Sequence, residues 1–302
     1  MLKFIAKRVL TIIPVLFGVT FMVYFLMTVA PGNPELTPLR KAETEEQKAQ
    51  MREDLGLNDP ILVRYFRMMR GLFRDDSGKA SRIITKMKVH LPKSLELCFV
   101  ALFFSVILAL PLGVIAAVKQ NTLFDGLSMI ISLIGVSMPN FWLGLILMIT
   151  FALKLGWFPT AGSSGPIYIV LPAATLAFIN MASIARVTRS SMLEVVRQDY
   201  IRTARAKGVA ERKIIMRHAL KNALIPTVTV VGTQLGELLS STIIIENVFA
   251  WPGIGRLLMQ AINSRDMSMM IACVIVFAVC VSIINLCVDI LYSLIDPRIS
   301  VS

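Results

Sequence analysis

The chain has 302 residues, of which 56% are hydrophobic and 17% are charged, and its mean hydropathy is +0.71. These values lie outside the usual range of soluble proteins and indicate an integral membrane protein. The formal charge of +12 is compatible with a nucleic-acid partner, but the basic residues cluster beside apolar stretches and form no DNA- or RNA-binding motif. We therefore expect this charge to set membrane orientation and to contact lipid headgroups.

The chain contains no recognisable catalytic or metal-binding pattern. Its only histidines, His90 and His218, lie outside the expected membrane core, and the sequence has no HExxH zinc motif. Its four cysteines fall within expected spans and form no CxxC pair, so we expect neither a disulfide nor a metal site. The sequence predicts a conduit and not an enzyme.

The first predicted element is a membrane span at residues 9–30. Basic residues precede this apolar stretch, as they do in a signal peptide, but the stretch is longer than a signal-peptide core and reaches the ~20 residues that cross a bilayer. We interpret it as an uncleaved span with its N-terminus in the cytoplasm.

Residues 31–93 follow as one sizeable polar segment, which we expect to form an extracytoplasmic domain. Thr44 and Gln47 have the spacing of a capping box, which predicts a helix that ends near Gly56. A second, amphipathic helix is predicted after Pro60. A faint likeness to a phosphate loop at residues 71–79 fails because the glycine spacing is too long and Ala80 replaces the Mg-binding Ser or Thr. The chain is not expected to bind ATP itself.

Five more spans are expected between residue 94 and a short tail that begins at Asp296, which places both termini in the cytoplasm. An outer loop at 155–166 and an outer re-entrant segment at 246–256 separate some of the spans. The predicted domains are 1–30, 31–93 and a five-helix core at 94–302. The fold class is all-α, with six transmembrane helices. The predicted spans after the first are 97–118, 126–153, 167–185, 222–245 and 267–292.

The topology prediction depends most on a basic segment that lies between the predicted spans 167–185 and 222–245. Between residues 186 and 221 it has ten Lys or Arg residues against three acids, which places it in the cytoplasm. Apolar residues recur at helical spacing on both sides of Gly208, which predicts helix, turn, helix. A solvated loop that only sets topology is the plainer alternative. An apolar face with Tyr200 and Ile201, the small residues and the turn glycine are not needed for that role, so we favour a docking surface.

This segment resembles the "EAA" coupling loop of permease subunits in binding-protein-dependent ABC importers, specifically the dipeptide, oligopeptide and nickel branch. Counting from Gly208, the generic Glu, Ile and Pro of the motif are absent, as is usual in the peptide branch. Further similarities at 137–142, 156–159 and 246–256 extend the resemblance over nearly the whole chain. The matching loop residues are 188–195 (TRSSMLEV), 199–208 (DYIRTARAKG) and 218–226 (HALKNALIP).

The resemblance implies a type I importer permease that moves di- or oligopeptides across the bacterial cytoplasmic membrane. It implies a second homologous permease, two ATP-hydrolysing subunits that hold the ATP and Mg, and an extracytoplasmic substrate-binding protein. The loop at 186–223 would then dock on an ATPase subunit. The residues that the resemblance assigns to this coupling contact are Asp199, Tyr200, Arg202, Thr203, Ala204, Ala206 and Gly208.

Two other functions stay open at this stage. One is a permease of the same family that carries nickel or a metal chelate, since such systems take metal as a complex and need no His or Cys cluster. The other is an ion-coupled secondary transporter, which would need no ATPase.

Glu237 and Asn140 are the candidates for the translocation pathway. A carboxylate near the middle of a span costs at least a few kcal/mol unless it faces water or a partner. Glu237 either lines the pathway or is a neutral, buried acid that is hydrogen-bonded to a neighbour such as Gln234. Asn140 follows Pro139, where it either lines the pathway at a kink or satisfies freed backbone groups.

Overall fold

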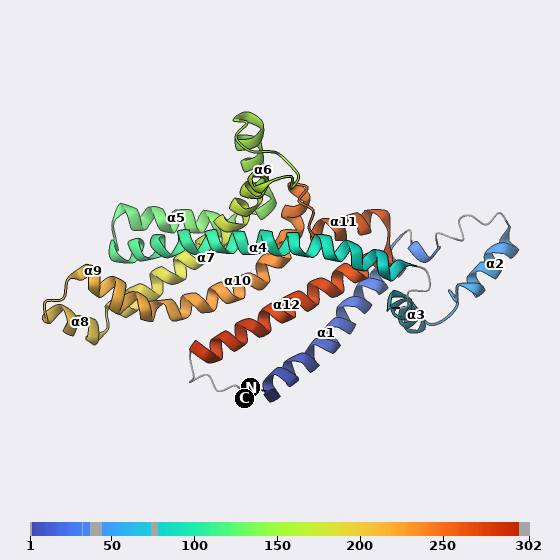
Figure 1. The fold of residues 1–302 in the computed structure, drawn as a ribbon, viewed down its shortest axis with the longest axis horizontal. Helices are drawn as coiled ribbons and strands as arrows, with labels where there is room; N and C mark the ends of the chain where they lie inside the picture. The colour runs from blue at the N-terminus through green and yellow to red at the C-terminus, as the bar shows by residue number, and fades with distance from the viewer. Residues whose placement is uncertain (1, 32, 37–43, 74–77, 296–302) are drawn as a thin grey trace. The chain divides into compact units, whose positions relative to one another are not determined.

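The computed structural model describes residues 2–31, 33–36, 44–73 and 78–295, and within these residues every regular element is helical (Figure 1). The expected all-α class is confirmed. The predicted tail from Asp296 lies outside the described residues. The elements of the N-terminal part are α1 (Leu2–Val29), η1 (Pro34–Leu36), α2 (Glu45–Asp54), α3 (Ile61–Phe73) and α4 (Lys79–Val118).

The remaining elements include two π-helical stretches, η3 and η5, alongside the α-helices. They are α5 (Leu123–Ser137), α6 (Asn140–Leu147), η3 (Met148–Lys154), η4 (Pro166–Ile169), α7 (Val170–Val196), α8 (Asp199–Ala206), α9 (Glu211–Lys213), η5 (Ile214–Ala219), α10 (Leu220–Val248), α11 (Ile254–Ser264) and α12 (Met267–Ile295).

Five stretches of the described chain are long and apolar enough to cross a membrane, and a sixth is obtained if one bent helix pair is counted as a single span. The bent pair corrects the prediction of one span at 126–153, for which the sequence suggested no more than a kink at Pro139. Its two parts, Leu123–Ser137 and Asn140–Lys154, meet at 108°. Pro139 explains the break, because a residue that precedes proline is driven out of the helical region, and Met138 has the extended angles φ −88° and ψ 128°.

The chain divides into two compact units, and α4 and α12 contribute residues to both. The predicted division into 1–30, 31–93 and 94–302 stays a prediction. The first unit comprises Met1–Lys93 and Gly253–Ser282, and the second comprises Ser94–Pro252 and Ile283–Ser302.

The first unit is built on aromatic contacts between α1 and α3. Tyr65 of α3 is 2% exposed, its hydroxyl lies 2.7 Å from that of Thr20, and its ring contacts Phe17, Phe21 and Tyr24. The predicted capping box at Thr44 is confirmed: its hydroxyl accepts from the Gln47 backbone, and the Gln47 side chain accepts from the Thr44 N–H. The amphipathic helix that was predicted after Pro60 is α3.

Helix α4 begins 18 residues before the predicted start of the second span at Leu97, so residues 79–93 are not a loop. The reason is a stripe of apolar residues at a spacing of four, Ile83, Met87 and Leu91, which packs into the core of the first unit with Leu257 and Met269. The basic residues between them obscure this stripe in the sequence.

In the second unit, α7 packs against both α5 and α10, and the three helices lie side by side in Figure 1. Two glycines permit close helix contact. A Cβ placed on Gly135 of α5 would lie 2.9 Å from the Cβ of Ala182 on α7. A Cβ on Gly113 of α4 would lie 2.7 Å from the carbonyl oxygen of Ala185. Real Cβ atoms do not approach so closely, so both contacts require glycine.

Candidate coupling site

Helix α8 is the centre of the predicted coupling loop, and it packs onto the chain through one buried side chain. Ile201 is fully buried in a cluster with Met192 of α7, Ile214 of η5 and Ala223 of α10. Removing a side chain of this size from water stabilises the packed state by about 1.5–3 kcal/mol. Ile201 was predicted to belong to an apolar docking face. The structure places it in the chain's own core.

The other side of α8 faces outward and carries most of the predicted coupling residues. Tyr200 is 43% exposed, and Asp199 and Arg202 form an exposed ion pair at 3.5 Å. Ala204 is half-buried beside the Ile201 cluster. The helix therefore combines a fixed inner side with a polar outer side, which is the arrangement that a docking helix needs. Also exposed are Thr203, Ala206 and Gly208.

The turn after α8 is closed by backbone conformation and by an ion pair. Gly208 has φ +75°, in the left-handed region that favours glycine, and its N–H donates to the carbonyl of Arg205 at 2.9 Å. The Arg205 guanidinium donates two hydrogen bonds of 3.1 and 2.6 Å to the carboxylate of Glu211. This contact raises the pKa of Arg205 above its ordinary value. The predicted helix, turn, helix is confirmed.

A second contact connects the start of α8 to α10. The hydroxyl of Tyr200 accepts a hydrogen bond from the Asn222 side chain at 2.7 Å. Between the turn and α10, residues Ile214–Ala219 form a π-helix, a rare conformation that is often found at functional sites. The start of α8 is thus held to α10 by a hydrogen bond, and the chain after the turn enters α10 through the π-helix.

Ten residues before α8, a partly buried ion pair joins α7 to α5. Arg189 Nε donates to Asp125 Oδ1 at 2.5 Å, and Arg189 Nη2 donates to Asp125 Oδ2 at 2.7 Å. The Asp125 side chain is 7% exposed and that of Arg189 is 20% exposed. Two parallel hydrogen bonds fix both the distance and the angle between the side chains. Local sequence patterns do not reveal this pair, because 64 residues separate its partners.

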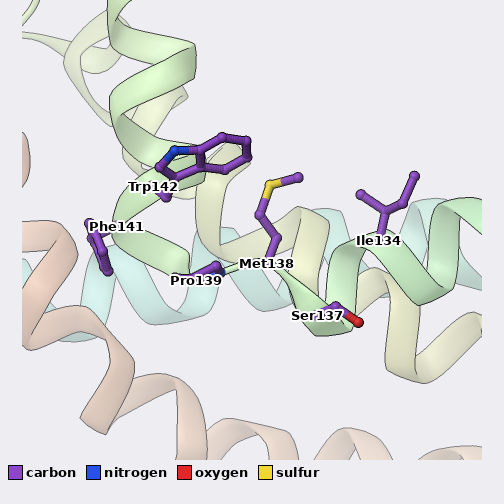
Figure 2. Close-up of a pocket in the computed structure, with 6 residues that line it drawn as sticks. All are labelled: Ile134, Ser137, Met138, Pro139, Phe141 and Trp142. Atoms are coloured by element: carbon purple, nitrogen blue, oxygen red, sulfur yellow. The ribbon is translucent and has the colours of Figure 1, made fainter.

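The bend between α5 and α6 borders a cavity of about 470 Å³. Figure 2 shows Ile134, Met138 and Trp142 extending from the same side of the bend. The predicted pathway residue Asn140 begins α6 and is half-buried, but it is not one of the six residues that line this cavity. The six are Ile134, Ser137, Met138, Pro139, Phe141 and Trp142.

Glu237 lies on an exposed side of α10, while its neighbour Gly236 is buried. Among the described residues, it forms no hydrogen bond or ion pair, so the expected partner Gln234 does not hold it. One interpretation of the sequence made Glu237 a neutral, buried acid that is hydrogen-bonded to a neighbour. Within this single chain, Glu237 does not fit that description. The structure does not bring Glu237 together with the α8 residues in one site; it lies 29 residues beyond Gly208 along the chain.

A model of the inner membrane component of binding-protein-dependent transport systems matches residues 109–301, and a model of the N-terminal part of such components matches residues 1–85. The chain belongs to this family. It is also 42% identical to the dipeptide transport system permease protein DppB of Alkalihalophilus pseudofirmus, over 99% of both chains. The resemblance seen in the sequence is confirmed, and the chain is a multi-pass membrane permease.

Other relatives of this permease differ in the cargo that their names give. The oligopeptide permease AppB of Bacillus subtilis is 36% identical over 99% of each chain, and the glutathione permease GsiC of Escherichia coli K12 is 38% identical over the same share. The fold of the permease resembles that of the MetNI methionine transporter, with a TM-score of 0.62 and 20% identity over 71% of this chain and 98% of that one.

No group of three or more His, Cys, Asp or Glu side chains among the described residues is placed to hold a metal ion. Among the polar contacts that were not predicted from the sequence are the Asp125–Arg189 pair and a hydrogen bond of 2.5 Å from Ser94 to the fully buried Glu246. The sequence placed Asp125 between two predicted spans, Arg189 in the basic segment and Glu246 in the predicted outer segment, so their charges alone were not distinctive. Charge also does not indicate which residues are the partners.

Proposed function

We propose that the permease is the transmembrane subunit of an ATP-driven importer of di- or oligopeptides in the bacterial cytoplasmic membrane. The observation that carries the cargo assignment is the 42% identity to a dipeptide permease over almost the entire length of both chains. Identity over 99% of each chain includes the pathway segments as well as the coupling loop, so it supports a shared type of cargo.

The exposed side of α8 is the proposed contact with an ATP-hydrolysing subunit. Its support is geometric: the helix is anchored by the buried Ile201, ends at the turn of Gly208, and leaves its polar side exposed to a partner's surface. ATP and Mg are held by two such partner subunits. The proposed contact residues are Asp199, Tyr200, Arg202, Thr203, Ala204, Ala206 and Gly208.

A second homologous permease completes the pathway, and an extracytoplasmic binding protein delivers the peptide. Glu237 is proposed to face this pathway, since an exposed carboxylate within an apolar helix needs water or a partner. Asn140 is proposed to lie at the edge of the pathway beside the bend. ATP binding would then shift the complex between outward-open and inward-open states.

The complex of this permease with its ATPase subunits, its second permease and its binding protein should be reconstituted in liposomes. Uptake of a labelled dipeptide should require ATP and the binding protein, and unlabelled tripeptide should compete with it. Uptake of labelled glutathione with no uptake of the labelled dipeptide would overturn the peptide assignment. Uptake that persists without an ATPase subunit, driven by an ion gradient, would overturn the ATP-driven mechanism.

Membrane orientation requires its own test, with both termini and α8 proposed to be cytoplasmic. In a cysteine-free background, Ala49→Cys in α2 should react with an impermeant thiol reagent added to spheroplasts. Ala210→Cys, in the coupling turn, should react only after permeabilisation. Both positions are exposed, so accessibility and not burial decides the labelling. The reverse pattern would contradict the proposed topology.

A further inference from the structure

The Asp125–Arg189 pair occupies a particular position along the chain. Arg189 lies ten residues before Asp199, the first residue of α8, and three residues before Met192, which belongs to the buried cluster around Ile201. Asp125 lies in the first turn of α5 and also accepts a hydrogen bond of 3.0 Å from the Asn121 backbone. The pair therefore joins the last third of α7, the helix that leads into α8, to the first turn of α5.

Helix α5 is attached to α7 along its whole length. Beyond the ion pair, Arg186 of α7 donates to the carbonyl of Ser132 at 3.4 Å. Near the last turn of α5, Gly135 contacts Ala182 so closely that no Cβ fits between the helices. A helix held at its first turn, its middle and its last turn moves with its partner as one body, because packed interiors deform little.

The far end of α5 is the bend at Met138 and Pro139, where α6 departs at 108° beside the 470 Å³ cavity. Helix α5 spans 15 residues, or about 21 Å at the rise of an α-helix. A displacement that passes from α8 through the end of α7 and the ion pair thus reaches the bend, one length of α5 away from Asp125. The bend lies where α5 ends, whereas α7 continues and also packs against α6.

We propose that Asp125 and Arg189 are positioning residues that transmit movement of the coupling helix through α5 to the bend. This inference rests on the proposed ATP-driven function. The bidentate geometry is what the role requires, since it resists rotation as well as separation of the two helices. Arg189→Lys keeps the charge but offers one point of contact instead of two, so it weakens the mechanical link without removing the ion pair.

The first test compares Arg189→Lys with the parent in the reconstituted complex, with each rate expressed per assembled complex. We expect basal ATP hydrolysis to be unchanged and the stimulation by peptide-loaded binding protein to fall about fivefold, an effect typical of residues in a coupling network. The matched control is Arg67→Lys, which alters an exposed Arg67–Asp59 pair in the first unit and should leave the stimulation at the parent value.

Unchanged stimulation in Arg189→Lys would overturn the inference. So would loss of assembly without a change in stimulation per complex, or complete loss of assembly, because the pair would then be structural only. Absence of stimulation in the parent itself is a different result, since it contradicts the proposed function and not the role of the pair.

A second test measures movement directly by spin-label distances. Labels at Leu133 of α5 and Arg197 at the end of α7 should keep their distance when ATP is added, because the two helices move together. Labels at Leu133 and at Leu145 of α6 should change their distance, because the bend separates them. A change in the first distance in the parent would show that α5 does not follow α7 and would overturn the proposal.

Discussion

The coupling turn and the bend at Pro139 both interrupt helices of the second unit, and they are constructed in opposite ways. The coupling turn at Gly208 is held by a fully buried Ile201, the Arg205–Glu211 pair and the Tyr200–Asn222 hydrogen bond. The bend at Pro139 is fixed by backbone preference and lies beside an open cavity. A turn that is restrained on several sides can receive force from a partner without deforming. A bend with free space beside it can change its angle.

The largest expected effect follows from placing a charge in the cluster beneath the coupling turn. Ile201→Asp would bury a carboxylate without a partner, so we expect no assembled complex to be recovered after detergent extraction. Ile201→Ala should give a milder loss, lowering the free energy of unfolding by about 2–5 kcal/mol. Recovery of Ile201→Asp at the parent yield would show that the cluster does not support the turn.

At Gly208, a substitution that forbids the observed backbone conformation should be more harmful than one that only enlarges the side chain. Gly208→Pro demands φ near −65° where the backbone has +75°, so we expect normal membrane insertion but no transport-linked ATP hydrolysis. Gly208→Ala has free space around its Cβ and should cost only about 1–2 kcal/mol for the left-handed conformation. Ala204→Trp should insert and lose coupling by blocking the partner's surface. Normal coupling in Gly208→Pro would contradict the role of the turn.

The coupling turn and the bend also differ in how far the sequence predicts them. Periodicity was sufficient for the coupling turn, because Ile201, Ala204 and Gly208 repeat at helical spacing and the last of them is a turn glycine. It was insufficient for the bend, because the residues on either side of Pro139 are similarly apolar and resemble one continuous span. The basic residues of 79–93 likewise hid the start of α4. The pairing of Asp125 with Arg189 depends on how α5 lies against α7, which no local pattern contains.

An intermediate effect is expected at the bend. Pro139→Ala removes the restriction on Met138 and allows α5 and α6 to join into one straighter helix. Spin labels at Leu133 and Leu145 should therefore show a broader distribution with a longer component than in the parent. The same labels with Pro226→Ala, in an exposed position of α10, serve as a control. An unaltered distribution in Pro139→Ala would mean that tertiary packing and not proline sets the bend.

The smallest effect is expected at Glu237, which contacts neither the coupling turn nor the bend at Pro139. Glu237→Gln keeps the size and removes the charge, so assembly should be normal and peptide uptake should fall about twofold to fivefold, as an exposed charge contributes roughly 1 kcal/mol or less. Glu237→Leu should also assemble, because the side chain is exposed within this chain. Poor assembly of the Leu variant with unchanged uptake by the Gln variant would instead assign Glu237 a structural role.

The π-helix between the coupling turn and α10 determines how these two elements are rotated relative to each other. Its hydrogen bonds reach one residue further than those of an α-helix, so the buried residues Ile214 and Ala219 are five apart, whereas Ala219, Ala223 and Thr227 follow at intervals of four. Such a segment corresponds to an α-helix that has gained one residue by insertion while both buried faces kept their alignment. The extra residue sets the phase between the turn and the span, and deletions on either side of η5 would rotate one against the other.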